Sequence, residues 1–507
     1  MKRVIVNQIK IGALLGYISL IVSTLANILL TPFMLYHLGA SDYGLYMLIG
    51  SFVGYLAIFD FGIGNAVVRY VAKYRAENKK REEENFLALS LIFYCLLSIL
   101  VLIIGTIIFF NFHRIFGRSL TPGEVETGKI MFAITVANLV LTFPLSLFSS
   151  IMSGYERFIL PRLLNILRVF VRVAVLYVLL EAGFKAVSIV MVDTILNILI
   201  MLINVLYVLF KLNVTIRFHR FDSPLLKEVF AYSFFVFLNL VVDQIFWRTG
   251  QIVLGLVAST ASVAIFSIGM QFVNYYMQFS TAISGVFLPR TTQMVVNNAS
   301  GNELTDLLIK TGRIQLAVLG YVLIGFGLLG NDFLVLWVGA GYTDAWIIAF
   351  MIMIPGTVPL FQNIAISILQ AKNRHSFRSI VYLIVAVANI FISVWLAKKF
   401  GLIGPAIGIV ITALVGNILV INLYYHFIIG LNIFRFFREL AKGLFPALSI
   451  SVLFGLFILF IPGTSWGMFI LKGILYSILY FAVVWFKGLN SSEKKMFADY
   501  LPCKMNS

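Results

Sequence analysis

Long apolar stretches recur along the whole of this 507-residue chain, and they decide what it can fold into. A helix needs about 20 apolar residues to cross the roughly 30 Å of hydrocarbon in a bilayer, and many of the stretches reach that length. Hydrophobic residues make up 61% of the chain and charged residues 12%, whereas soluble domains carry about 25% charged residues. The sequence therefore predicts an all-α integral membrane protein with about fourteen transmembrane spans. The expected spans are 11–37, 43–64, 86–110, 129–152, 163–181, 186–210, 229–256, 263–287, 313–329, 345–369, 379–397, 402–427, 443–461 and 466–486.

Two halves of the chain resemble each other. Residues 182–199 align with 400–419, where Ala186 falls on Ala406 and Asn197 on Asn417 at an offset of 220, and 153–157 align with 370–374 at an offset of 217. A repeat of this length is too long for a solenoid unit, whereas membrane transporters are commonly built from two such bundles with the substrate path between them. We expect a parallel repeat of two six-helix lobes followed by two extra C-terminal helices. The predicted divisions are 1–212, 213–430 and 431–507.

The basic residues predict the orientation. Most of the 38 Lys and Arg residues fall in segments on one side if both termini are placed in the cytoplasm, as the positive-inside rule requires. The formal charge of +17 is then a topological bias that also attracts anionic membrane lipid, so no nucleic-acid partner is expected. Lys472, near the outer end of its span, is expected to snorkel to the interface.

Several function classes lack the residues that they need. Neither a GxSxG elbow nor a GxxxxGK[ST] phosphate loop is present, and the segments between spans are too short to hold a catalytic domain. The two cysteines, Cys95 and Cys503, and the five scattered histidines have no metal-ligand spacing. We expect no catalytic residue, no metal and no cofactor.

Polar side chains form stripes on two of the expected helices. Ser23, Asn27 and Thr31 follow i, i+4, i+8 in the first span. A second stripe in the eighth span follows i, i+3, i+4, i+7 and consists of Gln271, Asn274, Tyr275 and Gln278. Both stripes favour an aqueous cavity, although hydrogen bonds between helices would explain any one of these residues equally well.

Charges inside the spans are stronger indicators, because lipid makes them costly. Arg168 and Arg172 lie one helical turn apart and share a face, and Arg172 is near mid-membrane. Arg248 is a third candidate. The carboxylates Asp193, Asp243 and Asp60 are candidates for ion pairing or for coupling to an ion. The structural alternative is an ion pair, either Asp193 with Arg172 or Asp243 with an Arg of the other lobe.

Two segments carry a family resemblance. Residues 38–46 (LGASDYGLY) and 59–74 (FDFGIGNAVVRYVAKY) resemble the N-terminal signature of the Wzx-type polysaccharide flippases, which belong to the superfamily of the MATE exporters and the lipid II flippase. The resemblance covers about residues 1–430. It implies a flippase that moves undecaprenyl-diphosphate-linked oligosaccharide from the cytoplasmic to the outer leaflet of the bacterial inner membrane by alternating access.

The resemblance also implies a site and partners. Arg172, Arg168 and Arg248 would bind the diphosphate, while Asn27 and the second stripe would offer hydrogen bonds to the cargo. Membrane lipid, a polysaccharide polymerase and chain-length machinery are the implied partners, and O-antigen, capsule or exopolysaccharide the implied product. Two alternatives stay open: a MATE-like drug or metabolite exporter, and a non-transport membrane component of the polysaccharide assembly machinery.

Overall fold

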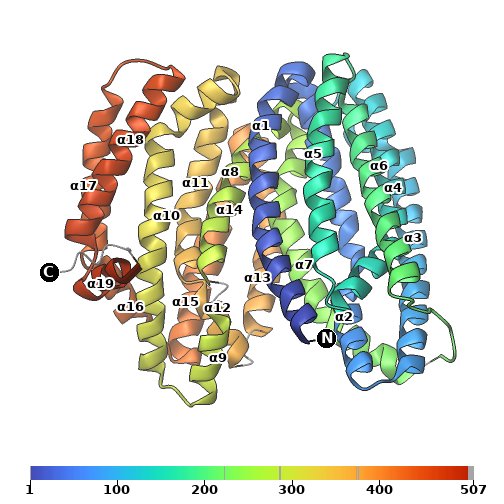
Figure 1. Cartoon of the computed structure of the whole chain (residues 1–507). Coiled ribbons are helices and arrows are strands. Elements are labelled where there is room, and N and C mark those ends of the chain that lie inside the picture. Colours follow the sequence, from blue (N-terminus) through green and yellow to red (C-terminus); the bar gives the residue numbers. More distant parts are fainter. Residues whose placement is uncertain (1, 222, 285–286, 373, 375, 501–507) are drawn as a thin grey trace. The chain divides into compact units, whose positions relative to one another are not determined.

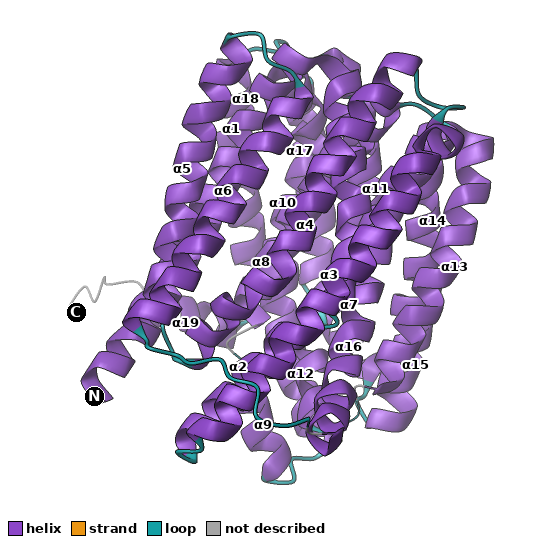
Figure 2. Cartoon of the chain, turned by 90° about the vertical axis from the view of Figure 1, so that its right-hand side faces the viewer, coloured by secondary structure: helices purple, strands orange, loops and turns teal. Residues whose placement is uncertain are grey.

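The computed structural model describes residues 2–221, 223–284, 287–372, 374 and 376–500, and within them it contains helices and no strand (Figure 2). The chain divides into two compact units, one ending at Ala264 and the other beginning at Ile265. The prediction of an all-α membrane fold is confirmed. The three-part division at residues 212 and 430 rests on the sequence repeat and stays a prediction, as does the repeat itself.

The first unit is a bundle of long helices (Figure 1). This bundle includes α7, which packs along α1. The predicted first lobe ends at residue 212, before α7 begins, so the compact unit extends beyond that predicted boundary. The helices are α1 (Lys2–Leu56), α2 (Ile63–Ala76), α3 (Lys80–Phe116), α4 (Pro122–Gly154), α5 (Ile159–Glu181), α6 (Ala186–Leu206), α7 (Ser223–Val257) and the start of α8 (Thr260–Ser284).

The second unit holds the rest of α8 and the helices that follow it. They are α9 (Leu288–Val296), α10 (Gly301–Trp337), α11 (Asp344–Phe361), α12 (Ile364–Ala371), α13 (Ser376–Phe400), α14 (Gly404–Thr412), α15 (Ile421–Tyr424), α16 (Ile433–Ala441), α17 (Leu444–Leu459), α18 (Trp466–Val483) and α19 (Ser491–Tyr500).

Ten helical segments of the described residues are long and apolar enough to cross a membrane, or eleven if the bent pair α16 and α17 counts as one. Two of the ten, Leu14–Ala76 and Ser376–Ile429, are 63 and 54 residues long. Each is longer than a single span, because each joins several successive helices that are separated only by short breaks. The number fourteen therefore stays a prediction.

The motif at 38–46 contains the bend of α1. Gly39 has φ 72° and ψ 174°, a backbone conformation that favours glycine because a Cβ atom would be strained there. Five residues later, a Cβ atom on Gly44 would lie 1.8 Å from the carbonyl oxygen of Thr260. The motif thus lets α1 bend and lets its second half pack directly against the start of α8.

Hydrogen bonds define the two ends of the first unit. At one end, Glu124 Oε1 accepts from the hydroxyls of Ser41 and Thr260, both at 2.5 Å. At the end that carries the N-terminus (Figure 1), Arg75 donates to the carbonyl of Gly154 at 3.1 Å, and Tyr155 donates to Glu83 at 2.9 Å. Loops of the first unit therefore alternate between the ends, as the predicted topology requires.

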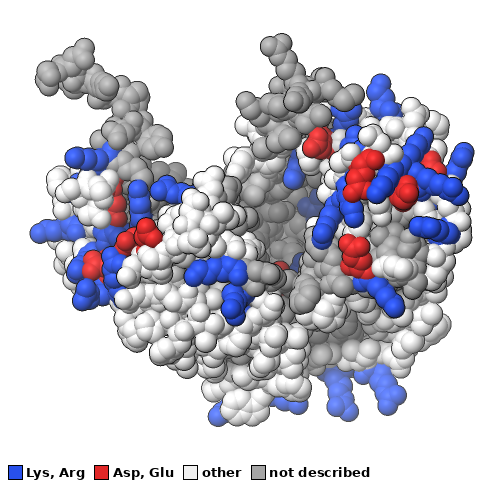
Figure 3. Space-filling view, turned by 90° about the horizontal axis from the view of Figure 1, so that it is seen from below, with Lys and Arg blue, Asp and Glu red and all other residues white. Residues whose placement is uncertain are grey.

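Figure 3 views the face at the N-terminal end of the first unit, where many Lys and Arg side chains gather with several Asp and Glu. This distribution agrees with the predicted cytoplasmic side, which itself stays a prediction. The expectation for Lys472 is wrong. Its side chain is 5% exposed, and its Nζ lies 2.9 Å from Asp332 Oδ2, so this buried lysine is held in an ion pair instead.

Candidate functional site

A cavity of about 460 Å³ lies inside the first unit, between α1, α4, α5 and α6. Its wall is mostly polar, with two guanidinium groups, one carboxylate, three amides and two hydroxyls. The lining residues are Ser19, Ser23, Ala26, Asn27 and Leu30 of α1, Asn138 of α4, Asn165, Arg168, Val169, Arg172 and Val173 of α5, and Asp193 of α6.

Helix α5 brings polar groups to this cavity because it has one polar and one apolar face. On α5, the side chains of Leu163, Leu167 and Phe170 are exposed on the outside of the bundle. Asn165, Arg168 and Arg172 follow i, i+3, i+7 on the opposite face, a spacing that aligns side chains along a helix. The polar face of α5 therefore forms one wall of the cavity, while its apolar face suits lipid.

Arg172 is held by a carboxylate and a phenol. Its Nε donates to Asp193 Oδ1 at 2.5 Å, and its Nη2 donates to Asp193 Oδ2 at 3.2 Å and to the hydroxyl of Tyr46 at 3.3 Å. The Tyr46 hydroxyl donates to Asp193 Oδ2 at 3.0 Å. The ion pair offered as the structural alternative is thus present, and it fixes the guanidinium in the cavity wall.

Part of the Arg172 guanidinium remains available. Its Nη1 has no hydrogen bond to any residue that the structure describes. The side chain is 18% exposed and lines the cavity. At 1.5 Å per residue, it lies roughly 20 Å along α5 from Ile159, in the central part of this 23-residue helix.

Arg168 differs from Arg172 in having no counter-ion. It is half-buried and lines the same cavity, yet among the described residues it has neither a hydrogen-bond nor an ion-pair partner. A partly desolvated guanidinium without a partner is costly in a membrane protein. The cavity therefore carries a net positive charge, concentrated at Arg168.

Amide hydrogen bonds fix the wall behind these arginines. Asn197 of α6 donates from Nδ2 to Asn138 Oδ1 at 2.9 Å and to the Thr142 hydroxyl at 2.8 Å, both on α4. Further along the same helices, Asn204 donates to the Ser149 hydroxyl at 2.9 Å. This polar seam joins α4 to α6 and keeps Asp193 in place.

Five residues predicted from the sequence meet at this cavity: Ser23, Asn27, Arg168, Arg172 and Asp193. Sequence reasoning missed Tyr46, Asn138 and Asn165. Asn165 could have been found, because it continues the stripe of Arg168 and Arg172 by one helical turn. Tyr46 and Asn138 come from other helices, and no spacing along the chain points to them.

Three other predicted residues of the first unit lie elsewhere. Arg248 of α7 packs across Gly54, where a Cβ atom would lie 3.2 Å from its Nε, and it is not among the lining residues. Asp60 lies next to Tyr94. Asp243, on α7, is exposed and has an interaction partner.

The second polar stripe belongs to the second unit. Gln271 Nε2 donates to the Tyr275 hydroxyl at 2.6 Å, and Asn274 Nδ2 donates to the backbone carbonyl of Met270 at 3.0 Å. Gln278 is half-buried on the same helix. Hydrogen bonding within α8 involves three members of the stripe, Gln271, Asn274 and Tyr275, and the part of the stripe in binding cargo stays a prediction.

Solved structures share this fold. A lipid II flippase MurJ in an inward closed conformation is 18% identical, with 93% of this chain and 98% of that chain covered and a TM-score of 0.70. An inward-facing multidrug resistance MATE transporter is 15% identical, with 78% and 92% covered and a TM-score of 0.59. A MATE complex with MaL6 is 16% identical, with 81% and 94% covered and a TM-score of 0.53. A comparison with curated proteins returns no match.

The chain therefore has many helices that could span a membrane, and it shares its fold with a lipid II flippase and with MATE transporters. A model of the polysaccharide biosynthesis protein family matches residues 12–295, more than half of the chain. The chain belongs to this family. The resemblance to a flippase-type family that residues 38–46 and 59–74 indicated is confirmed.

Proposed function

We propose that this protein is a flippase that moves undecaprenyl-diphosphate-linked oligosaccharide from the cytoplasmic to the outer leaflet of the bacterial inner membrane by alternating access. One observation carries the proposal: the cavity of the first unit presents the guanidinium of Arg168, which has no partner among the described residues, beside the guanidinium of Arg172, whose Nη1 also has no hydrogen bond to a described residue. The family and the shared fold support the same class of cargo.

A diphosphate suits this wall. Guanidinium groups bind phosphate oxygens through charge-assisted hydrogen bonds, which are shorter and stronger than neutral ones. Asn27, Asn165 and the serines of α1 supply neutral donors around them. The cavity volume falls within the range of about 300–1,000 Å³ that is typical of small-ligand pockets, so it would hold the head group but not the oligosaccharide. The stripe of Gln271, Asn274, Tyr275 and Gln278 is proposed to contact sugars.

The charge of the wall weighs against a MATE-like exporter of cations. Asp193 is the only carboxylate among the residues described as lining the cavity, and both of its oxygens are bonded to Arg172. A cationic drug would meet a site with excess positive charge and no free carboxylate. An anionic head group would relieve the cost of the unpaired Arg168.

The test uses cells that lack the native copy, in which surface polysaccharide and the amount of this protein in membranes are both measured. We expect Arg168→Ala to abolish export at a normal protein level, Arg168→Lys to retain part of it, and Arg172→Glu to abolish it through repulsion. Arg162→Ala is the matched control, because Arg162 is an exposed arginine on the same helix outside the cavity lining.

The outcomes separate the alternatives. Loss of resistance to cationic drugs with unchanged surface polysaccharide would favour the exporter. Wild-type polysaccharide together with unchanged drug resistance in Arg168→Ala and Arg172→Glu cells would favour a non-transport role in assembly, alongside the polymerase and chain-length machinery proposed as partners. Normal export by Arg172→Glu alone would already refute binding of the diphosphate at this cavity.

A further inference from the structure

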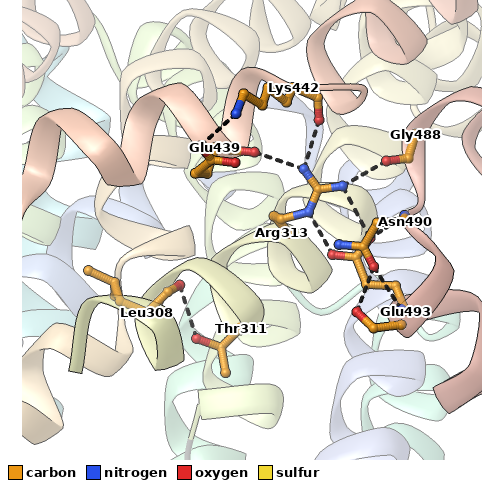
Figure 4. Close-up of polar contacts among 9 residues, drawn as sticks. Leu308, Thr311, Arg313, Glu439, Lys442, Gly488, Asn490 and Glu493 are labelled. Atoms are coloured by element: carbon orange, nitrogen blue, oxygen red, sulfur yellow. Dashed lines mark hydrogen bonds and ion pairs between the residues drawn. The ribbon is translucent and has the colours of Figure 1, made fainter. Parts of the chain in front are cut away.

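Arg313 of α10 gathers separate segments of the second unit around one buried guanidinium (Figure 4). Its Nη1 donates to the backbone carbonyls of Glu439 at 2.9 Å and Lys442 at 2.8 Å, at the end of α16. Its Nη2 donates to the carbonyl of Gly488 at 2.8 Å, beyond the end of α18. These carbonyls flank both ends of the hairpin formed by α17 and α18.

The remaining partner of Arg313 comes from α19. Arg313 Nε donates to Glu493 Oε1 at 2.6 Å, and Nη2 donates to Oε2 at 3.1 Å. The backbone of Asn490 also donates to Glu493 Oε2 at 2.8 Å, and Asn490 Oδ1 accepts from the Glu493 amide at 2.9 Å. This reciprocal cap presents the carboxylate at the start of α19 in the geometry that the guanidinium requires.

Among the side chains of α19 that the structure describes, Glu493 is the one that is buried in the second unit. It is 3% exposed, whereas Ser491, Ser492 and Lys495 are exposed and Lys494 is half-buried. Glu493 also supplies the only full negative charge among the groups bonded to Arg313, since the others are neutral carbonyls. Without Glu493, Arg313 would be a buried cation with no counter-ion.

The hairpin ends are packed tightly at the same place. Gly443, just before α17, has φ 77°, and a Cβ atom on it would lie 2.9 Å from the carbonyl oxygen of Lys487 and 3.1 Å from that of Gly488. Both ends of the hairpin therefore depend on the backbone arrangement that Arg313 holds. Loss of the hydrogen bonds of Arg313 should therefore alter the positions of α17 and α18.

We propose that Arg313 forms a binding site for a carboxylate carried on a short helix, and that α19 is a dockable latch on this site. With Glu493 docked, the carbonyls of Glu439, Lys442 and Gly488 are held on α10, and the α17–α18 hairpin is fixed there. With Glu493 released, the guanidinium lacks its counter-ion and the hairpin loosens from α10. This inference does not depend on which cargo the protein moves.

The experiment measures the approach of α17 to α10 in the full-length protein. Leu328→Cys on α10 and Gly455→Cys on α17 are placed where a Cβ atom on Gly455 would lie 2.3 Å from Leu328 Cδ1, in a chain with Cys95→Ala and Cys503→Ala. The rate of disulfide formation under mild oxidation measures how closely α17 approaches α10. The rate of trypsin cleavage at Lys494 and Lys495 measures how often α19 leaves its docked position.

We expect Glu493→Gln to speed the cleavage and to slow disulfide formation by roughly tenfold or more, because the buried guanidinium loses its counter-ion. Glu493→Asp keeps the charge and should retain most of the disulfide rate. Glu439→Gln is the matched control, since it removes a neighbouring carboxylate that pairs with Lys442 but leaves the carbonyl that Arg313 uses.

Disulfide formation at the wild-type rate in Glu493→Gln would overturn the latch, whether or not α19 is cleaved faster. An equal slowing by Glu439→Gln would also overturn it, because the effect would then follow local charge rather than docking at Arg313.

Discussion

The Tyr46 hydroxyl and Arg172 Nη2 meet on the same oxygen, Oδ2 of Asp193, at 3.0 and 3.2 Å. The two halves of α1 therefore have different tasks at this site. The segment before the Gly39 bend lines the cavity with Ser23 and Asn27, and the segment after it supplies Tyr46 to the ion pair. The family motif at 38–46 thereby contributes directly to the geometry of the proposed site.

This arrangement predicts that the Arg172–Asp193 pair stabilises the first unit. Asp193→Ala should lower the free energy of unfolding by roughly 3 kcal/mol, because it leaves Arg172 without its counter-ion. Thermal unfolding in detergent measures the effect. If the pair is only structural, the Arg172→Ala, Asp193→Ala double variant recovers both stability and export; if Arg172 also binds cargo, it recovers stability but not export.

Arg168 is predicted to affect binding rather than folding. Because it has no partner among the described residues, Arg168→Ala should leave the unfolding temperature unchanged or raise it. Loss of charge-assisted hydrogen bonds worth ~1.5–3 kcal/mol should weaken diphosphate binding by about 10- to 100-fold. Titration of purified protein with undecaprenyl diphosphate checks this, with Arg162→Ala as the control. A marked loss of stability would show that Arg168 has a structural role instead.

Gly44 is predicted to tolerate no side chain. Gly44→Ala would place a Cβ atom 1.8 Å from the Thr260 carbonyl oxygen, so α1 and α8 would have to separate, and the protein should be less stable and less abundant in membranes. Gly50→Ala on the same helix meets nothing within 4 Å and should be neutral or stabilising by ~0.5–1 kcal/mol. Equal behaviour of the two variants would contradict the close packing at Gly44.

The predicted topology is tested by labelling with an impermeant thiol reagent in intact cells. Single cysteines at Ser41, Thr121 and Thr343, in a chain without Cys95 and Cys503, should react from outside. Cysteines at Asn78, Asn298 and Ser491 should react only after the membrane is opened. In the first unit, Ser41 and Thr121 already lie together through Glu124. Labelling of Asn78 in intact cells would reverse the proposed direction of transport.

The sequence predicted the parts of the site that lie on one helix. Spacing placed Arg168 and Arg172 on the same face of α5, and both line the cavity. The cost of a charge in lipid suggested Asp193 as a partner for Arg172, which the structure confirms. These inferences succeed because helical periodicity and the membrane constrain residues that are near in sequence.

Contacts between distant segments could not be predicted in the same way. Tyr46 and Asp193 are separated by 147 residues, and Arg313 and Glu493 by 180, so no spacing rule connects them. Lys472 was misjudged because its burial depends on Asp332, 140 residues away on α10. At the position 217 residues after Arg172, the predicted repeat places Asn389, which is fully buried, so sequence similarity alone does not transfer the site to the second unit.

The most direct test reconstitutes the purified protein in liposomes that carry undecaprenyl-diphosphate-linked oligosaccharide in one leaflet. An impermeant glycosidase then measures how much oligosaccharide reaches the other leaflet. We expect transfer by the wild-type protein and by Arg162→Ala, and strong loss of transfer by Arg168→Ala at equal reconstitution. Transfer by Arg168→Ala at the wild-type rate, or no transfer by the wild-type protein, would contradict the proposed function.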